Sequence, residues 1–175
     1  MIAMKNEVYV IYEESSSGGE YKSDEEFSSR EDTHCSFDVE GVFIGENQGA
    51  LYVETVSVDF DPDKITDVYV VYGRYDTGDT FGRTYGKGHI SGVYDTYEKA
   101  KKAKVLIEEI YGLYDINSSF SKNKNKPLND KLQEWCQLNG IDSKDVWVGS
   151  IGPWHGYFES LDEIHIEVFP IKRYK

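Results

Sequence analysis

The chain is organised around residues 68–97, which read VYVVYGRYDTGDTFGRTYGKGHISGVYDTY. The β-branched and aromatic run at residues 68–72 predicts a strand that is apolar on both faces. A connection with four glycines follows, between Gly78 and Gly88, and residues 89–94 predict a second, short strand. Asp95 and Glu98 form a variant of the capping box that opens a helix. The segment is therefore expected to form a strand, a glycine-rich connection, a strand and a helix.

An apolar stripe at helical spacing continues from this segment. The stripe consists of Tyr97, Ala100, Ala103, Ile107, Ile110 and Tyr114, and it predicts a helix over residues 97–111 that ends near Gly112. We expect this helix to pack across three neighbouring strands, at residues 68–75, 89–94 and 164–169. A second, short helix is predicted from Asn129 to Gly140, with Leu132, Trp135 and Cys136 on its buried side.

The remaining apolar runs predict further strands. In the N-terminal third these are residues 8–12, 37–43 and 51–58, with Phe37, Val39 and Phe43 on one face of the second run. Near the C-terminus they are residues 146–151 and a last strand with Ile164, Ile166 and Val168 facing inward. The strands come in runs, which favours an α+β fold: an antiparallel or mixed sheet of six to seven strands with two helices on one face.

The domain organisation follows from this order and from the length of 175 residues. Residues 1–66 predict an acidic all-β part with a long loop, and residues 67–175 predict a β-β-α-α-β-β core. A chain of this length suits one compact domain that buries roughly 70% of its unfolded surface.

Two short segments of the sequence recur. Residues 8–12 (VYVIY) parallel residues 68–72 (VYVVY), and residues 40–43 (EGVF) parallel residues 91–94 (SGVY). One interpretation is a duplicated pair of strands whose first copy lacks the helix. The alternative is chance, because strands draw on few residue types.

The negative charge is concentrated in the first third of the chain. Residues 1–66 hold 16 acidic and 4 basic side chains, so this part carries −12 of the total net charge of −13. Such a field repels nucleic acids and membrane surfaces and attracts basic partners. The start of the sequence has no apolar leader segment, and no apolar run reaches membrane length. A cytoplasmic protein that does not bind nucleic acid directly is therefore expected.

Signatures of catalysis or metal binding do not emerge from the sequence. The cysteines, Cys35 and Cys136, are expected to be free thiols in a reducing compartment. The four histidines (His34, His89, His155 and His165) form no metal-ligand pattern with them. There is no G-x-S-x-G motif, and pairs of carboxylates such as Asp79 and Glu159 arise by chance in any acidic protein. We therefore expect a non-enzymatic protein without a metal or cofactor.

Two segments of the chain resemble a known family. Residues 78–82 (GDTFG), with Thr77 before them, and residues 154–159 (WHGYFE) are similar to segments of small uncharacterised bacteriophage proteins. The resemblance covers roughly residues 68–110 and 153–170. It implies a phage or prophage origin, where small acidic accessory proteins interfere with host defence, and it assigns no catalytic role. The cytoplasm would then be that of an infected bacterium.

The glycine-rich connection suggests one binding hypothesis. Backbone amides freed by glycines can surround an anion, and neighbouring cations and aromatic rings could hold a nucleotide signal without turning it over. The residues for such a site are Asp79, Thr80, Arg83, Tyr85, Lys87, Trp154 and Tyr157. However, the connection leads into a strand and not a helix, so a hairpin whose glycines serve the turn is the competing interpretation.

The leading hypothesis concerns the acidic N-terminal part. A protein that blocks a nucleic-acid-binding host enzyme, such as a CRISPR effector, needs spaced carboxylates where the phosphates would lie. The carboxylates predicted to bind the partner are Asp24, Glu25, Glu26, Glu31, Asp32, Asp38 and Glu40. The competing interpretation is a surface charge that serves only solubility.

Overall fold

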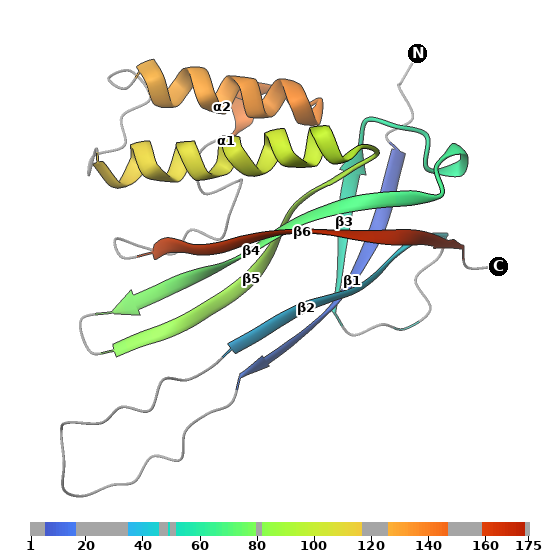
Figure 1. Cartoon of the computed structure of the whole chain (residues 1–175), viewed down its shortest axis with the longest axis horizontal. Coiled ribbons are helices and arrows are strands. Elements are labelled where there is room, and N and C mark those ends of the chain that lie inside the picture. Colours follow the sequence, from blue (N-terminus) through green and yellow to red (C-terminus); the bar gives the residue numbers. More distant parts are fainter. Residues whose placement is uncertain are drawn as a thin grey trace, which may run out of the picture.

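The computed structural model describes residues 6–16, 35–45, 49, 52–79, 82–116, 126–146 and 159–173. Within these ranges the chain forms six strands and two helices (Figure 1). The strands are β1 (Asn6–Ser16), β2 (Cys35–Ile44), β3 (Val53–Val58), β4 (Asp67–Asp79), β5 (Gly82–Tyr94) and β6 (Glu159–Arg173). The helices are α1 (Tyr97–Ile116) and α2 (Lys126–Asn139), and two short 3-10 turns are η1 (Pro62–Lys64) and η2 (Ser143–Asp145).

All six strands belong to one mixed sheet with the order β3-β1-β2-β6-β4-β5. Neighbouring strands are antiparallel except for β2 and β6, which run parallel over three residue pairs. The two end strands, β3 and β5, lie against each other, so the sheet curls almost into a barrel. The predicted α+β fold with two helices on one face is confirmed, and so is the expected neighbourhood of β4, β5 and β6.

In its described residues, the glycine-rich connection is paired into the two strands that it was expected only to join. Strand β5 begins at Gly82, and its first residues pair with the end of β4 through Thr77 and Thr84, and through Gly78 and Arg83. The other edge of β4 is held by β6, where Thr77 pairs with Glu159. Pairing on both edges of β4 extends the ladder through residues whose own strand propensity is low.

Helix α1 packs across β4, β5 and β6, as its apolar stripe predicts. Ala100, Ala103, Ile107 and Ile110 are fully buried, whereas Tyr97 is 48% exposed, contrary to expectation. Tyr97 is the first residue of the helix, and its ring packs edge to face with that of Tyr69, with 5.8 Å between the ring centres. The cap is Thr96, whose hydroxyl accepts the amide hydrogen of Lys99 at 3.3 Å. The helix also continues past Gly112 to Ile116.

Helix α2 covers the outer side of α1 (Figure 1). The predicted buried side is confirmed, since Leu132, Trp135 and Cys136 are at most 6% exposed. The helix begins at Lys126 and not at Asn129, with Pro127 in the first turn, where its missing amide hydrogen costs nothing. Gly140 follows the helix with a φ of +64°, a left-handed conformation that glycine adopts without strain.

Two apolar cores lie on the two faces of the β4-β5-β6 part of the sheet. One lies under the helices and includes Val71, Tyr94 and Ile164. The other lies inside the curled sheet and combines residues of both predicted parts of the chain, including Val8, Val10, Phe37, Val42, Val68, Val70 and Phe169. Successive side chains of β4 point alternately into the two cores, which explains why residues 68–72 are apolar at every position.

The inward face predicted for the last strand is correct only in part. Ile164 is buried and Ile166 packs against the core under the helices. Val168, two residues further along the same face, is 53% exposed. Phe169 points instead into the core of the curled sheet. The helices therefore cover only the first half of the β6 face.

The structure supports the interpretation of the two short matching segments as a structural repeat. In the β1–β2 hairpin, Tyr9 pairs with Phe43, Val10 with Val42, Ile11 with Gly41 and Tyr12 with Val39. In the β4–β5 hairpin, the corresponding pairs are Tyr69–Tyr94, Val70–Val93, Val71–Gly92 and Tyr72–Ile90. Both hairpins thus carry one extra residue at the same place, Glu40 in the first and Ser91 in the second.

The repeat also includes the third strand of each half. Strand β3 pairs with β1 through Val10 and Glu54, and strand β6 pairs with β4 through Val70 and Glu167. The order β3-β1-β2 therefore recurs as β6-β4-β5. We refer to β1, β2 and β3 as the N-terminal repeat and to β4, β5 and β6 as the C-terminal repeat. Among the described elements, helices lie between the second and third strands of the C-terminal repeat and not of the N-terminal repeat.

Candidate functional site

Three carboxylates form an acidic face on the β1–β2 hairpin: Glu13, Asp38 and Glu40. Glu13 pairs with Asp38 across the two strands, so both side chains lie on the same side of the ladder. Phe37 and Val39 alternate with Asp38 and point into the core, which leaves Asp38 and Glu40 exposed, as predicted. The extra residue of the hairpin is Glu40 itself, and this brings its carboxylate beside Glu13.

The carboxylates of the acidic face repel one another. The neighbouring charge of Glu13 raises the pKa of Glu40 above its ordinary value, with smaller contributions from desolvation and from a hydrogen bond between the two side chains. Lys172 acts in the opposite direction, and its ammonium group lies 5.5 Å from the centre of the Phe43 ring. The net upward shift shows that nearby cations do not cancel the repulsion at Glu40.

A row of rings anchors this hairpin to the other half of the sheet. The ring centres are 4.8 Å apart for Tyr12 and Phe37, 5.9 Å for Phe37 and Tyr72, and 5.5 Å for Tyr72 and His165. The Tyr72 hydroxyl also donates a hydrogen bond of 2.9 Å to Glu167. These contacts run from β1 through β2 to β4 and β6. The hairpin that carries the acidic face is therefore packed against the other half of the sheet.

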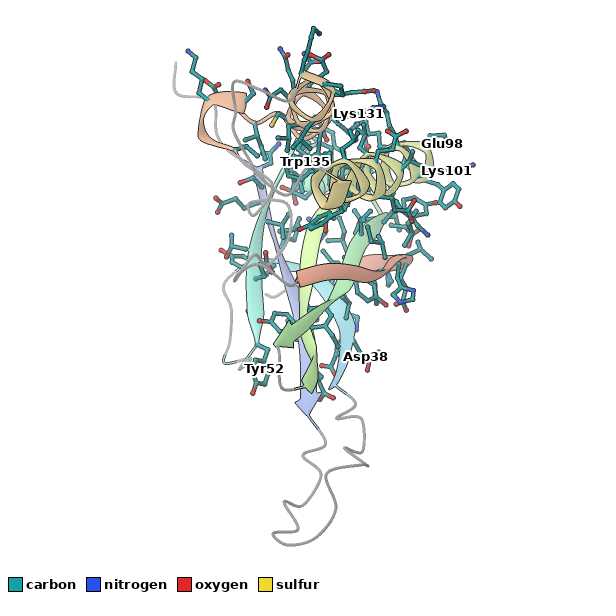
Figure 2. All side chains as sticks on the ribbon, turned by 90° about the vertical axis from the view of Figure 1, so that its left-hand side faces the viewer. Asp38, Tyr52, Glu98, Lys101, Lys131 and Trp135 are labelled. Carbon is teal, nitrogen blue, oxygen red and sulfur yellow. The ribbon has the colours of Figure 1, made fainter. Side chains whose placement is uncertain are left out.

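Five of the seven predicted partner-binding carboxylates fall outside the described residues. These are Asp24, Glu25, Glu26, Glu31 and Asp32, all in the segment that joins β1 to β2. The structure thus locates Asp38 and Glu40 of the predicted set and adds Glu13, which the sequence reasoning did not select. The signal for Glu13 was its place on the outward side of a strand next to the acidic segment. Figure 2 shows Asp38 and Tyr52 at the end of the molecule opposite the helices.

The residues of the nucleotide hypothesis are described only in their backbone or not at all. Asp79 ends β4, and Arg83, Tyr85 and Lys87 belong to β5, but their side chains are not described. Thr80, Trp154 and Tyr157 lie outside the described residues. The backbone of Arg83 and Tyr85 pairs with β4. The described part of the connection is therefore engaged in a ladder and is not the open loop on which the hypothesis depended.

A groove of about 400 Å³ lies between α1 and α2, and the sequence reasoning did not anticipate it. Its walls are joined by ion pairs, Lys131 to Glu109 at 2.6 Å and Lys102 to Glu134 at 3.1 Å. The lining contains as many acidic as basic side chains, which are already paired in part across the groove. Figure 2 shows Lys131, Lys101 and Glu98 around the two helices. Paired charges of this kind hold the helices together and offer no net field to a ligand.

Glu54 closes the seam between the two end strands of the sheet and was also not predicted. Its side chain points from β3 toward β5, where its carboxylate accepts a hydrogen bond from the backbone amide of Ile90. Burial raises the pKa of Glu54, and the hydrogen bond from Ile90 partly opposes this rise. The carboxylate therefore replaces a strand-to-strand hydrogen bond where the sheet curls onto itself.

The described part of the chain contains neither a metal-binding cluster nor a membrane-spanning helix. Within it, no group of three or more His, Cys, Asp or Glu side chains is arranged to hold a metal ion. No helix in the same ranges has the length and apolar character needed to span a membrane. The thiol of Cys136 is buried and free, and burial raises its pKa, which disfavours the reactive thiolate.

Comparison with known proteins provides no assignment for this arrangement, since no family model, curated protein or solved structure matches the chain.

Proposed function

We propose that the protein is a non-enzymatic binding protein that engages a basic surface of a partner protein through its acidic N-terminal part. The observation that carries the proposal is the contact between Glu13 and Glu40 beside Asp38, three carboxylates held together on an exposed face. Grouping like charges costs stability, and a cationic partner would remove that cost on binding.

The partner class follows from the charge distribution and from the family resemblance. A net charge of −12 over residues 1–66 favours a protein whose basic surface normally binds nucleic acid. The resemblance to bacteriophage proteins points to an enzyme of host defence as that partner. In this role the carboxylates occupy the surface that phosphates would occupy, and the protein acts as an inhibitor without turnover.

The salt dependence of binding tests this function. The protein is immobilised, bacterial lysate is passed over it, and captured proteins are eluted with increasing salt or with double-stranded DNA. We expect release between low and physiological ionic strength, where the Debye length falls to about 8 Å, and displacement by DNA. Capture that resists both salt and DNA would contradict the proposal.

Charge-neutralising variants identify the responsible surface. The Asp38→Asn/Glu40→Gln variant should weaken capture, and so should a variant with Glu25, Glu26, Glu31 and Asp32 replaced by the corresponding amides. The matched control is Glu98→Gln/Glu108→Gln, which removes two exposed carboxylates from α1. An equal loss of capture by the control variant would show that capture depends on net charge alone, and it would refute a localised acidic surface.

A further inference from the structure

The structural repeat identifies a half-buried apolar face in the N-terminal repeat. In the C-terminal repeat, Tyr69, Val71, Tyr94 and Ile166 form the floor on which the helices pack. The strand pairings assign their counterparts as Tyr9, Ile11, Phe43 and Val53. We call these four residues the outer face of the N-terminal repeat. An aromatic, a branched aliphatic, an aromatic and a branched aliphatic residue thus recur at the same register positions.

The two faces differ in what lies on them. Val71 is fully buried and Tyr94 is 2% exposed, because α1 and α2 cover them. Ile11, Tyr9 and Val53 are only half-buried, and they belong to neither apolar core. The helices contact β4, β5 and β6. Among the described elements, the outer face of the N-terminal repeat therefore has no layer that corresponds to the helices.

The detailed geometry of the floor is also repeated. In the C-terminal repeat, the Tyr94 ring folds over Gly92, so closely that a Cβ atom there would lie 2.5 Å from the Tyr94 hydroxyl oxygen. In the N-terminal repeat, the Phe43 ring folds over Gly41, with a corresponding distance of 3.0 Å to Cε2. Each repeat thus places a glycine under a folded aromatic ring, and in the C-terminal repeat the helices pack on this floor.

We propose that the outer face of the N-terminal repeat is a docking site for an amphipathic helix of a partner protein, with basic residues flanking its apolar stripe. The C-terminal repeat shows that an amphipathic helix fits this floor. Most charges around the outer face are acidic, and they specify the flanks: Glu7, Glu13, Asp38 and Glu40 are exposed around it. Lys172 lies at the β2 edge of the face, with its ammonium group 5.5 Å from the centre of the Phe43 ring. This inference rests on the proposed function and defines the secondary structure of the partner that the acidic N-terminal part recognises.

A synthetic helix provides the probe. The peptide keeps the apolar residues of α1 at their helical spacing and carries lysine at the positions that α1 exposes. One control peptide carries glutamate at those positions, and a second has the same lysine-rich composition in a scrambled order. Fluorescence anisotropy of labelled peptides then measures binding to the full-length protein. We expect the basic helix to bind at least tenfold more tightly than either control.

Variants of the protein place the peptide on the outer face. Ile11→Ser and Val53→Ser should each weaken binding of the basic helix at least tenfold, since each removes apolar contact near the centre of the site. The matched control is Val168→Ser, which alters an exposed valine on the C-terminal repeat and should leave binding unchanged. Circular dichroism confirms that each variant is folded.

Three outcomes would overturn the docking site. Equal binding of the ordered and scrambled lysine peptides would show attraction by charge alone, which the acidic-surface function survives. Absence of binding by the basic helix would remove the docking site, and the salt and DNA elution experiment would still decide the acidic-surface function separately. Self-association in sedimentation experiments that Ile11→Ser abolishes would assign the face to a second copy of this chain.

Discussion

The two repeats of this molecule use the same strand pattern for different purposes. Strand order, pairing register and the position of the extra hairpin residue are shared. In the C-terminal repeat both faces of β4 are covered, one by the curled sheet and one by helices. In the N-terminal repeat only the inner face belongs to a core. The strand pattern therefore specifies the pairing of the strands. The exposure of their outer faces depends on whether the chain inserts helices between the second and third strands.

The extra residue of each hairpin shows why the exposed carboxylate lies in the N-terminal repeat and not in the C-terminal repeat. Ser91 is 7% exposed in the C-terminal repeat, whereas Glu40 occupies the same place in the N-terminal repeat and is exposed. A carboxylate at the buried position would lose its hydration without a compensating partner. The N-terminal repeat can thus carry the acidic face because neither α1 nor α2 covers it, and the two features belong together.

The largest expected effect concerns the helix layer. Ile107 is fully buried between α1 and the sheet, so Ile107→Ala should lower the free energy of unfolding by about 2–5 kcal/mol. The comparison substitution is Ile11→Ala on the half-buried outer face, with an expected loss below about 1 kcal/mol. Urea denaturation measures both. Equal losses would mean that the outer face is covered as fully as its counterpart.

The paired glycines give the next largest effect. A methyl group at Gly92 would meet Tyr94, whose hydroxyl is fixed by a 2.7 Å hydrogen bond to Asn139, so Gly92→Ala should cost about 1–3 kcal/mol. At Gly41 the closest approach is longer, 3.0 Å to the Phe43 ring, and this ring is only half-buried, so Gly41→Ala should cost less. Thermal or urea denaturation of the two variants tests the order, and a larger cost at Gly41 would contradict it.

Much of the fold was predictable because its signals are local. Residues 68–72 are apolar at every position, and the structure shows that β4 is covered on both faces. The apolar residues from Ala100 to Ile110 recur at helical spacing. This spacing places them on the face of α1 that packs on the sheet, and it also made the helix recognisable in the sequence. The extent of β5 was not predictable in this way, because it depends on pairing with β4, which β6 supports from the other edge.

The candidate site was predictable only where strand alternation decides it. Asp38 lies between two buried residues, so its exposure followed from the sequence. The contact of Glu13 with Glu40 depends on the extra hairpin residue, and the closure by Glu54 depends on the curling of the sheet. Neither has a local sequence signal. The repeat was detectable from short matches, but its significance came from the shared pairing register.

A third, smaller effect concerns the aromatic residue above each glycine. The Tyr94 hydroxyl donates to the Asn139 side chain and so ties the sheet to α2, and Tyr94→Phe should lower the free energy of unfolding by about 1 kcal/mol. Its counterpart is already a phenylalanine that is only half-buried, so Phe43→Tyr should be nearly neutral. Urea denaturation decides. A neutral Tyr94→Phe would show that the hydrogen bond contributes nothing net.

The smallest expected effect is the pH dependence of the seam at Glu54. Burial raises the pKa of this carboxyl group, so the folded protein holds the proton more tightly than the unfolded chain. Its contribution to stability is therefore complete below the unfolded pKa and is lost as pH rises through the folded pKa. The amide of Ile90 opposes burial, which keeps the effect small.

Glu54→Gln removes the titration and keeps an oxygen for the Ile90 amide. Relative to the original protein, this variant should gain stability as pH rises above about 4, the ordinary pKa of a glutamate, as measured by urea denaturation from acidic to neutral pH. A stability difference that falls with rising pH would show that the Ile90 hydrogen bond outweighs burial, and the seam would then be held by a charged carboxylate.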